Sequence, residues 1–138
     1  MRQQIIQLTI PGEPQGKQRP RWSPVGTYSP KKTVNYETYI KELFAIKYPD
    51  FVPVESVLEM ELIIWLMIPA STSKRKKALM ECGDLRPGKI PDVDNVLKVV
   101  MDALEKLAYK NDAKIVTAHQ GKFYANKPHL DINIYELE

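Results

Sequence analysis

A run of apolar residues at residues 96–108 of the 138-residue chain constrains the fold most strongly. These residues recur at spacings of three and four, the periodicity of one face of an α-helix. They are Val96, Leu97, Val100, Met101, Leu104, Leu107 and Ala108. Asp94 or Asn95 is expected to cap the start of the helix, because a short side-chain oxygen can accept a free backbone N–H there. Asn111 and Asp112 have the composition of the turn that ends it.

The rest of the chain shows strand patterns and two further helices. Alternation of apolar and polar residues predicts strands over residues 6–10, 57–68, 115–124 and 130–137. Helices are expected over residues 33–47 and from a cap at residues 71–73 to Gly83. The order is therefore β-α-β-α-α-β-β, which predicts an α+β fold: one compact domain spanning residues 1–138, with a small mixed β-sheet packed by helices.

The second face of the long strand at 57–68 changes character along its length. Glu59 and Glu61 are expected to face solvent. Beyond them this face is apolar, with Ile63, Trp65 and Met67. A strand that is apolar on both faces is expected at the centre of a sheet or at an interface.

Residues 15–32 are rich in proline and glycine, so a loop without regular structure is expected. The loop contains no acidic residue, and Trp22 and Tyr28 lie among its basic ones, which are Lys17, Arg19, Arg21, Lys31 and Lys32. Such a composition can hold a phosphate backbone while aromatic rings stack on exposed bases. Alternatively, it is an ordinary solvated loop that Trp22 anchors to the core.

A second basic cluster lies in the predicted helix before Gly83. It consists of Lys74, Arg75, Lys76 and Lys77. Such a run is usually a solvated face. Because it precedes the acidic segment, it could also guide phosphates toward that segment, together with Lys89 in the intervening loop.

The overall composition excludes several classes of protein. The 20 basic and 17 acidic residues give a net charge of only +3. The single cysteine, Cys82, allows no intramolecular disulfide and is typical of a reducing cytoplasm. The chain does not open with a signal-peptide pattern, and its longest apolar run, residues 62–70, is too short to span a bilayer. We therefore expect a cytoplasmic protein without a membrane partner.

Asp92 and Asp94 are separated by one residue just before the predicted central helix. In an extended segment two such side chains point the same way, and the pair repels itself unless it is protonated or bridged by a cation. Hard oxygen ligands in small number suit Mg²⁺, and Asp112 could supply a third carboxylate. Alternatively, these aspartates serve only as cap and turn residues, and Lys98 forms a surface ion pair with Asp102, four residues on.

The string PDVDNVLKVVMDAL, followed by NDAKIV, resembles the signature of the RusA family of Holliday junction resolvases. The resemblance covers residues 89–116 and extends to GKQRPR and YSPKKTVNYE, which are similar to the Gram-positive and phage branch. It implies metal-binding aspartates at Asp92, Asp94 and Asp112 and a catalytic lysine at Lys98. In one departure, the family usually has two adjacent acids in the turn, and here the first is Asn111.

The resemblance implies a structure-selective endodeoxyribonuclease that resolves four-way DNA junctions with Mg²⁺ in recombination and repair. The basic residues predicted to bind this branched DNA are Lys17, Arg19, Arg21, Lys74, Arg75, Lys76 and Lys89. A homodimer is expected, because two symmetric cuts need two acidic clusters and the chain has one. Two alternatives remain open: a metal-dependent nuclease acting on other branched DNA, and a DNA-binding module without enzymatic activity.

Overall fold

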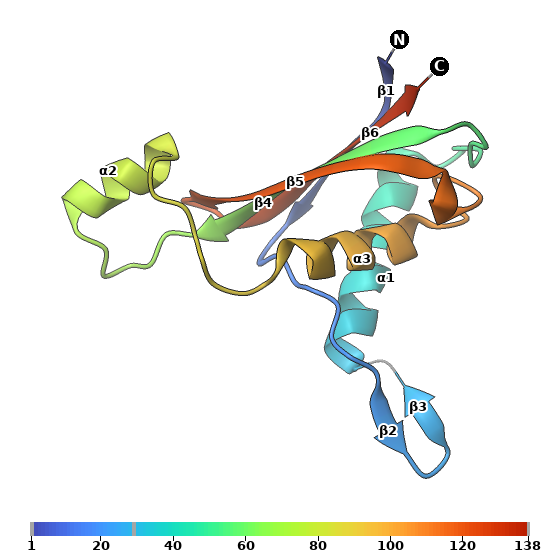
Figure 1. Cartoon of the computed structure of the whole chain (residues 1–138), viewed down its shortest axis with the longest axis horizontal. Coiled ribbons are helices and arrows are strands. Elements are labelled where there is room, and N and C mark those ends of the chain that lie inside the picture. The colour runs from blue at the N-terminus through green and yellow to red at the C-terminus, as the bar shows by residue number, and fades with distance from the viewer. Residues whose placement is uncertain (1, 29, 138) are drawn as a thin grey trace.

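A four-stranded sheet forms the centre of the computed structural model, which describes residues 2–28 and 30–137 (Figure 1). Its strands are β1 (Arg2–Pro11), β4 (Leu58–Met67), β5 (Ile115–Ala125) and β6 (His129–Leu137). They lie in the order β1-β6-β4-β5, and β4 pairs with β5 in parallel while the other pairs are antiparallel. The α+β class and the mixed sheet predicted from the sequence are therefore confirmed.

Two helices, α1 (Lys31–Lys47) and α3 (Val93–Leu104), cover one face of this sheet (Figure 1). The sheet side of the core includes alternate residues of β4, which are Leu58, Met60, Leu62, Ile64 and Leu66, together with buried residues of β1 and β6. The residues of α3 that meet them are equally buried and are Val96, Val99, Val100, Ala103 and Leu104. The predicted apolar face of the central helix is therefore confirmed in part: Val96, Val100 and Leu104 are fully buried, but Leu97 and Met101 are only partly buried. Val99 and Ala103, which the prediction omitted, are fully buried instead.

The acidic residues of β4 do not simply face solvent, as the sequence pattern had suggested. Glu59 accepts a hydrogen bond from Arg2 at 2.6 Å, and only 12% of its side chain is exposed. Glu61 accepts a hydrogen bond from Asn133 at 3.0 Å. Asn133 lies on the adjacent strand β6, whereas Arg2 reaches Glu59 from β1, one strand further away, and the two acids are half-buried rather than free.

The central helix ends four residues earlier than its periodicity predicts. Glu105 is extended, and Lys106 has a positive φ of 71°, so the helical hydrogen bonding stops at Leu104. The chain then turns back, and the buried Tyr109 donates a hydrogen bond through its hydroxyl to the carbonyl of Met101 at 2.7 Å. Leu107 and Ala108 still pack against the core from this turn, which is why the apolar spacing continues beyond the helix.

The short helix α2 (Lys74–Cys82) lies at one end of the molecule, away from α1 and α3 (Figure 1). Its predicted boundaries are confirmed: the Ser73 hydroxyl accepts a hydrogen bond from the Lys76 amide, and Gly83 follows in the left-handed conformation. None of the helices in residues 2–28 and 30–137 is long and apolar enough to cross a membrane.

The segment expected to be an irregular loop contains a hairpin, formed by β2 (Arg21–Ser23) and β3 (Gly26–Tyr28). Gly26 allows the turn because its φ of 125° is one that other residues rarely adopt, and Ser23 donates a side-chain hydrogen bond to its carbonyl. The hairpin projects from the body of the molecule (Figure 1). Trp22 is 78% exposed, so it does not anchor this segment to the core.

Residues 13–20, between β1 and the hairpin, pack closely against the beginning of α3. The Lys17 amide donates to the carbonyl of Asn95 at 2.9 Å, and the Gln18 amide donates to the buried hydroxyl of Thr33 at 3.0 Å. A Cβ atom added to Gly16 would lie 2.9 Å from the Cβ of Asn95. Glycine is therefore required here for the close approach of segment 13–20 to α3.

Replacement of Gly16 by Ala is expected to destabilise the protein, because the added methyl group would push segment 13–20 away from α3. Overpacking of this kind costs about 1–3 kcal/mol of unfolding free energy. Gly88→Ala is the matched control, since a Cβ at Gly88 meets nothing within 4 Å. Urea unfolding of both variants measures the effect, and equal stability of the two would contradict the close packing at Gly16.

Candidate functional site

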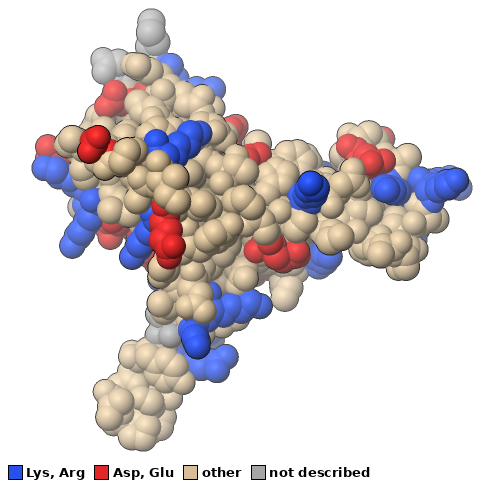
Figure 2. Space-filling model, turned by 180° about the vertical axis from the view of Figure 1, so that it is seen from behind, with Lys and Arg blue, Asp and Glu red and all other residues tan. Residues whose placement is uncertain are grey.

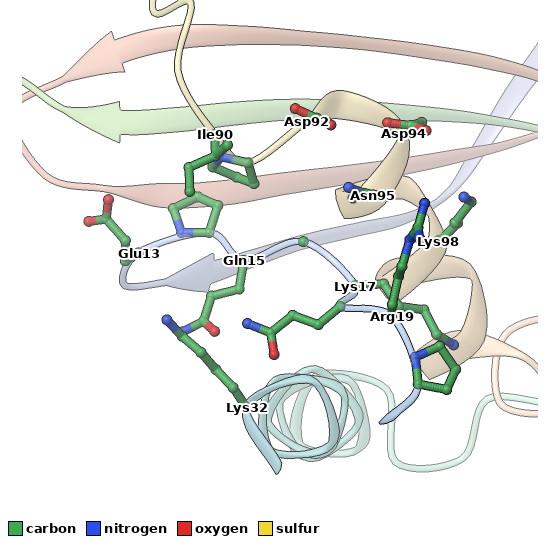
Figure 3. Close-up of a pocket in the computed structure, with 15 residues that line it drawn as sticks. Glu13, Gln15, Lys17, Arg19, Lys32, Ile90, Asp92, Asp94, Asn95 and Lys98 are labelled. Carbon is green, nitrogen blue, oxygen red and sulfur yellow. The ribbon is translucent and has the colours of Figure 1, made fainter. Parts of the chain in front are cut away.

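Segment 13–20 and the beginning of α3 enclose an open cavity of about 980 Å³, shown in Figure 3. One wall comes from residues 13–20 and the other from residues 90–98. The charged side chains that line it are Glu13, Lys17, Arg19, Lys32, Asp92, Asp94 and Lys98. Hence segments about seventy residues apart in the sequence meet at one surface.

Asp92 and Asp94 both line this cavity, as expected from their spacing, but the backbone that holds them differs from the prediction. Asp92 is extended and occupies the N-cap position, whereas Asp94 lies inside the first turn of α3. The helix thus begins before Asp94 rather than at it. Asp92 makes no side-chain capping hydrogen bond, so its carboxylate is not used to close the helix. Both side chains are exposed and lie on the same side of the helix start in Figure 3.

Asp112, the third predicted carboxylate, lies at the opposite end of α3. Its amide donates a hydrogen bond to the side chain of Glu105, just beyond the helix, and it begins the short 3₁₀ turn Asp112–Lys114 that leads into β5. A helix of 12 residues is about 18 Å long, so Asp112 does not join Asp92 and Asp94 within one chain. In the described part of the chain, no three His, Cys, Asp or Glu residues are grouped so as to hold a metal ion.

Lys98 is exposed on the cavity wall, one helical turn after Asp94. Arg19 faces it from the other wall, and the two side chains extend toward the side of the cavity where Asp94 lies (Figure 3). The alternative interpretation of Lys98 as the ion-pair partner of Asp102 is wrong, since the partner of Asp102 is Lys17. The cavity thus places two acids beside two cations.

Lys17 has a structural role that the sequence did not indicate. Its ammonium group forms an ion pair with Asp102 on α3 and lies 3.8 Å from Glu37 on α1. The hydrogen bond to Asp102 raises the pKa of Lys17, with smaller contributions from the nearby negative charges. In Figure 3 the Lys17 side chain points away from Asp92 and Asp94. This lysine ties segment 13–20 to both helices.

The other residues predicted to bind nucleic acid lie outside the described lining of the cavity. Arg21 begins the hairpin, and Lys74, Arg75 and Lys76 lie on α2. Lys89 precedes the acidic pair, and its ammonium lies 6.0 Å from the ring centre of Tyr124. Figure 2 shows basic side chains on the lobe formed by α2 and on the neck of the hairpin.

Sequence reasoning did not find several residues of the cavity. Glu13, Gln15 and Gln18 line it because segment 13–20 is anchored to Asn95 and Thr33. Ile90, which is mostly exposed, lines it beside the acids. Their types and spacing carry no signal of this position, since it depends on contacts between segments distant in the sequence. Gly16 is a local feature that fits this close approach, but only the structure shows it, with a Cβ at this position 2.9 Å from the Cβ of Asn95.

Two comparisons with known proteins identify relatives of this chain. The family model described as endodeoxyribonuclease RusA matches residues 11–135, which include both walls of the cavity. The chain is also 34% identical over 138 residues to the uncharacterized protein YqaN of Bacillus subtilis (strain 168), and the alignment covers 96% of each chain. The match spans nearly the whole domain rather than the acidic segment alone, and on this evidence the chain belongs to the RusA family of endodeoxyribonucleases.

Proposed function

We propose that this protein is a structure-selective endonuclease that resolves four-way DNA junctions by Mg²⁺-dependent hydrolysis, in DNA recombination and repair. The observation that carries the proposal is the cavity in which Asp92 and Asp94 lie beside Arg19 and Lys98. Carboxylates suited to a metal and cations suited to a phosphate occur there together, within the region that matches the endodeoxyribonuclease family. Membership of the family supports a nuclease, and branched DNA is the substrate we infer.

Asp92 and Asp94 fit Mg²⁺ through the chemistry of their side chains. This ion retains several waters and is commonly bound by one or two carboxylates together with substrate phosphate. Both aspartates are exposed, and Asp92 is not used as a capping group, so their oxygens are available for this purpose. A bound Mg²⁺ would polarise the phosphate and lower the pKa of a coordinated water.

Lys98 and Arg19 would act on the phosphate itself. Their charges lie on the two walls of the cavity, so a phosphate entering between the walls would meet a cation on each side. Fixed positive charges stabilise the negative charge that grows on the phosphate oxygens in the transition state. Lys17 would act through segment 13–20, because its ion pair with Asp102 holds the segment that bears Arg19.

A homodimer is part of the proposal for two reasons. Two symmetric cuts in a four-way junction require two active sites, and a two-fold pair of subunits supplies them most simply. The separation of Asp112 from the acidic pair within one chain further supports a site that the Asp112 of a second subunit completes. The outer face of β4, with Ile63 and Trp65 half-buried and Met67 exposed, offers apolar surface for such a contact.

Two other functions would use the same surface. A nuclease for other branched DNA would cut flaps as readily as four-way junctions, and a DNA-binding module would bind without cutting. A cleavage assay with a synthetic four-way junction, a flap and a linear duplex, each with Mg²⁺ or EDTA, separates the three. Preferential, Mg²⁺-dependent cutting of the four-way junction is the result we expect.

Replacement of Asp92, Asp94 or Asp112 by Asn, one at a time, is expected to abolish junction cleavage while leaving folding and junction binding intact. Asn is nearly isosteric and remains a good capping and turn residue, so a purely structural aspartate would tolerate the change. Asp50→Asn, in the turn after α1, is the control. Cleavage and binding are measured at limiting Mg²⁺, and a variant that cuts normally removes its aspartate from the site.

Lys98→Ala is expected to lower the turnover of junction cleavage by at least about 100-fold, the loss typical when one preorganised charge-stabilising donor is removed. An exposed lysine contributes little to stability, so the melting temperature should stay within about 2 °C of the parent. Lys41→Ala, on the exposed surface of α1, is the control. Single-turnover cleavage rates measure the effect. An unchanged rate would show that Lys98 takes no part in cleavage.

Mixed dimers test whether Asp112 acts across the subunit interface. A dimer of one Asp92→Asn and one Asp112→Asn subunit keeps one complete site if Asp112 comes from the other subunit, and none if it comes from the same one. Random exchange should therefore restore about one quarter of the strand cuts of the parent. A mixture of Asp92→Asn and Asp94→Asn subunits should stay inactive in either case. No recovery in the first mixture, or a monomer by light scattering, would reject the shared site.

A further inference from the structure

The hairpin formed by β2 and β3 exposes apolar side chains that neither the core nor the cavity uses. Trp22 is 78% exposed, Val25 at the tip is 98% exposed and Tyr28 is 51% exposed. Single exposed apolar residues are ordinary on protein surfaces, but three of them on one eight-residue hairpin indicate a surface that binds another molecule. Figure 1 shows the hairpin extending away from the sheet and from both core helices.

The register of the hairpin separates its aromatic residues onto two faces. Trp22 pairs with Thr27, and Arg21 pairs with Tyr28. Successive residues of a strand point to opposite faces, so the Trp22 ring lies on one face and the Arg21 and Tyr28 side chains on the other. On the first of these faces the only cross-strand neighbour of Trp22 is the small side chain of Thr27. The indole ring is therefore accessible to a planar group such as a base.

Charge identifies the class of that partner. Residues 22–28 carry no charge, whereas the neck of the hairpin carries the cations Arg19, Arg21, Lys31 and Lys32. Residues 14–36 contain no Asp or Glu. Figure 2 shows this division, with a tan tip and blue side chains at the neck. An uncharged aromatic tip above a basic neck suits nucleic acid, since the neck attracts phosphates and the ring can stack on a base.

The hairpin is also continuous with the candidate site. Arg19 lines the cavity, and β2 begins only two residues later. DNA whose phosphate lies between Arg19 and Lys98 would therefore pass along the hairpin on leaving the cavity. In continuous duplex the faces of the bases are covered by their neighbours, whereas at a branch point the stacking is interrupted and a face is open.

We propose that Trp22 stacks on a base exposed at the branch point of DNA, while Arg19 and Arg21 hold the flanking phosphates. This inference rests on the proposed function, because it takes branched DNA as the substrate of the cavity. It assigns the preference for branched over continuous DNA to the hairpin rather than to the acidic pair. The site at Asp92 and Asp94 would hydrolyse a phosphodiester in any DNA that enters the cavity. The hairpin would select branched DNA for binding there.

The test compares Trp22→Ala, Trp22→Phe and a control, Ile46→Ala, which removes an exposed apolar side chain from α1. Each binds, in EDTA, a four-way junction that carries 2-aminopurine at the branch point, and a linear duplex of the same sequence. Loss of one base–aromatic stack should weaken junction binding by about 10-fold or more and leave duplex binding nearly unchanged. Trp22→Phe should retain most of the affinity, and Ile46→Ala all of it.

The fluorescence of 2-aminopurine should change when the parent binds and stay unchanged with Trp22→Ala. Equal junction affinity of Trp22→Ala and the parent would overturn the inference, as would an equal loss on junction and duplex. Smaller particles of Trp22→Ala in light scattering would assign the hairpin to a second copy of the chain instead. If the parent binds and cuts junctions while Trp22→Ala matches it, the inference alone fails. If the parent binds no branched DNA, the proposed function fails with it.

Discussion

Burial of one face of α3 between the sheet and α1 is the constraint on which the candidate site depends. Val96, Val99, Val100, Ala103 and Leu104 are completely buried, so the helix can neither rotate nor slide without exposing them. This fixes the direction of the opposite, polar face. Asp94 and Lys98 lie on that face one turn apart, and Asp102 follows one turn later. The apolar residues of α3 thereby determine where its charged residues point.

The polar face of α3 in turn positions the first part of the chain. The carbonyl of Asn95 accepts a hydrogen bond from the Lys17 amide, and the Asp102 carboxylate forms an ion pair with the Lys17 ammonium group. Gly16 allows the two segments to approach closely. These contacts use a backbone carbonyl and a carboxylate on the rigid helix to hold a segment that has no regular structure of its own. Arg19 and the hairpin follow directly after this anchor in the chain, so a helix at residues 93–104 positions a surface formed by residues 13–28.

The sequence predicted those features of the site and fold that depend on local patterns. The period of the apolar residues identified the helices and strands, and the spacing of Asp92 and Asp94 identified two side chains that line one cavity. Features decided by distant contacts were not predictable. The early end of α3 could not be seen in the periodicity, because the turn that follows it still packs Leu107 and Ala108 against the core. The ion pair of Lys17 with Asp102 joins residues 85 positions apart, and no periodicity records it.

The order of the strands in the sheet has a consequence for synthesis of the protein. β6, the last strand in the chain, lies between β1 and β4, and β1 has no other neighbour in the sheet. Until residues 129–137 have left the ribosome, the first strand has nothing to pair with, and the segment that follows it has no fixed starting point. Such long-range pairing forms slowly and late. A partly synthesised chain therefore contains the acidic residues while the strand that leads into segment 13–20 is still unpaired, so until β6 is made the wall that faces these acids depends on its contacts with Asn95 and Asp102 of α3.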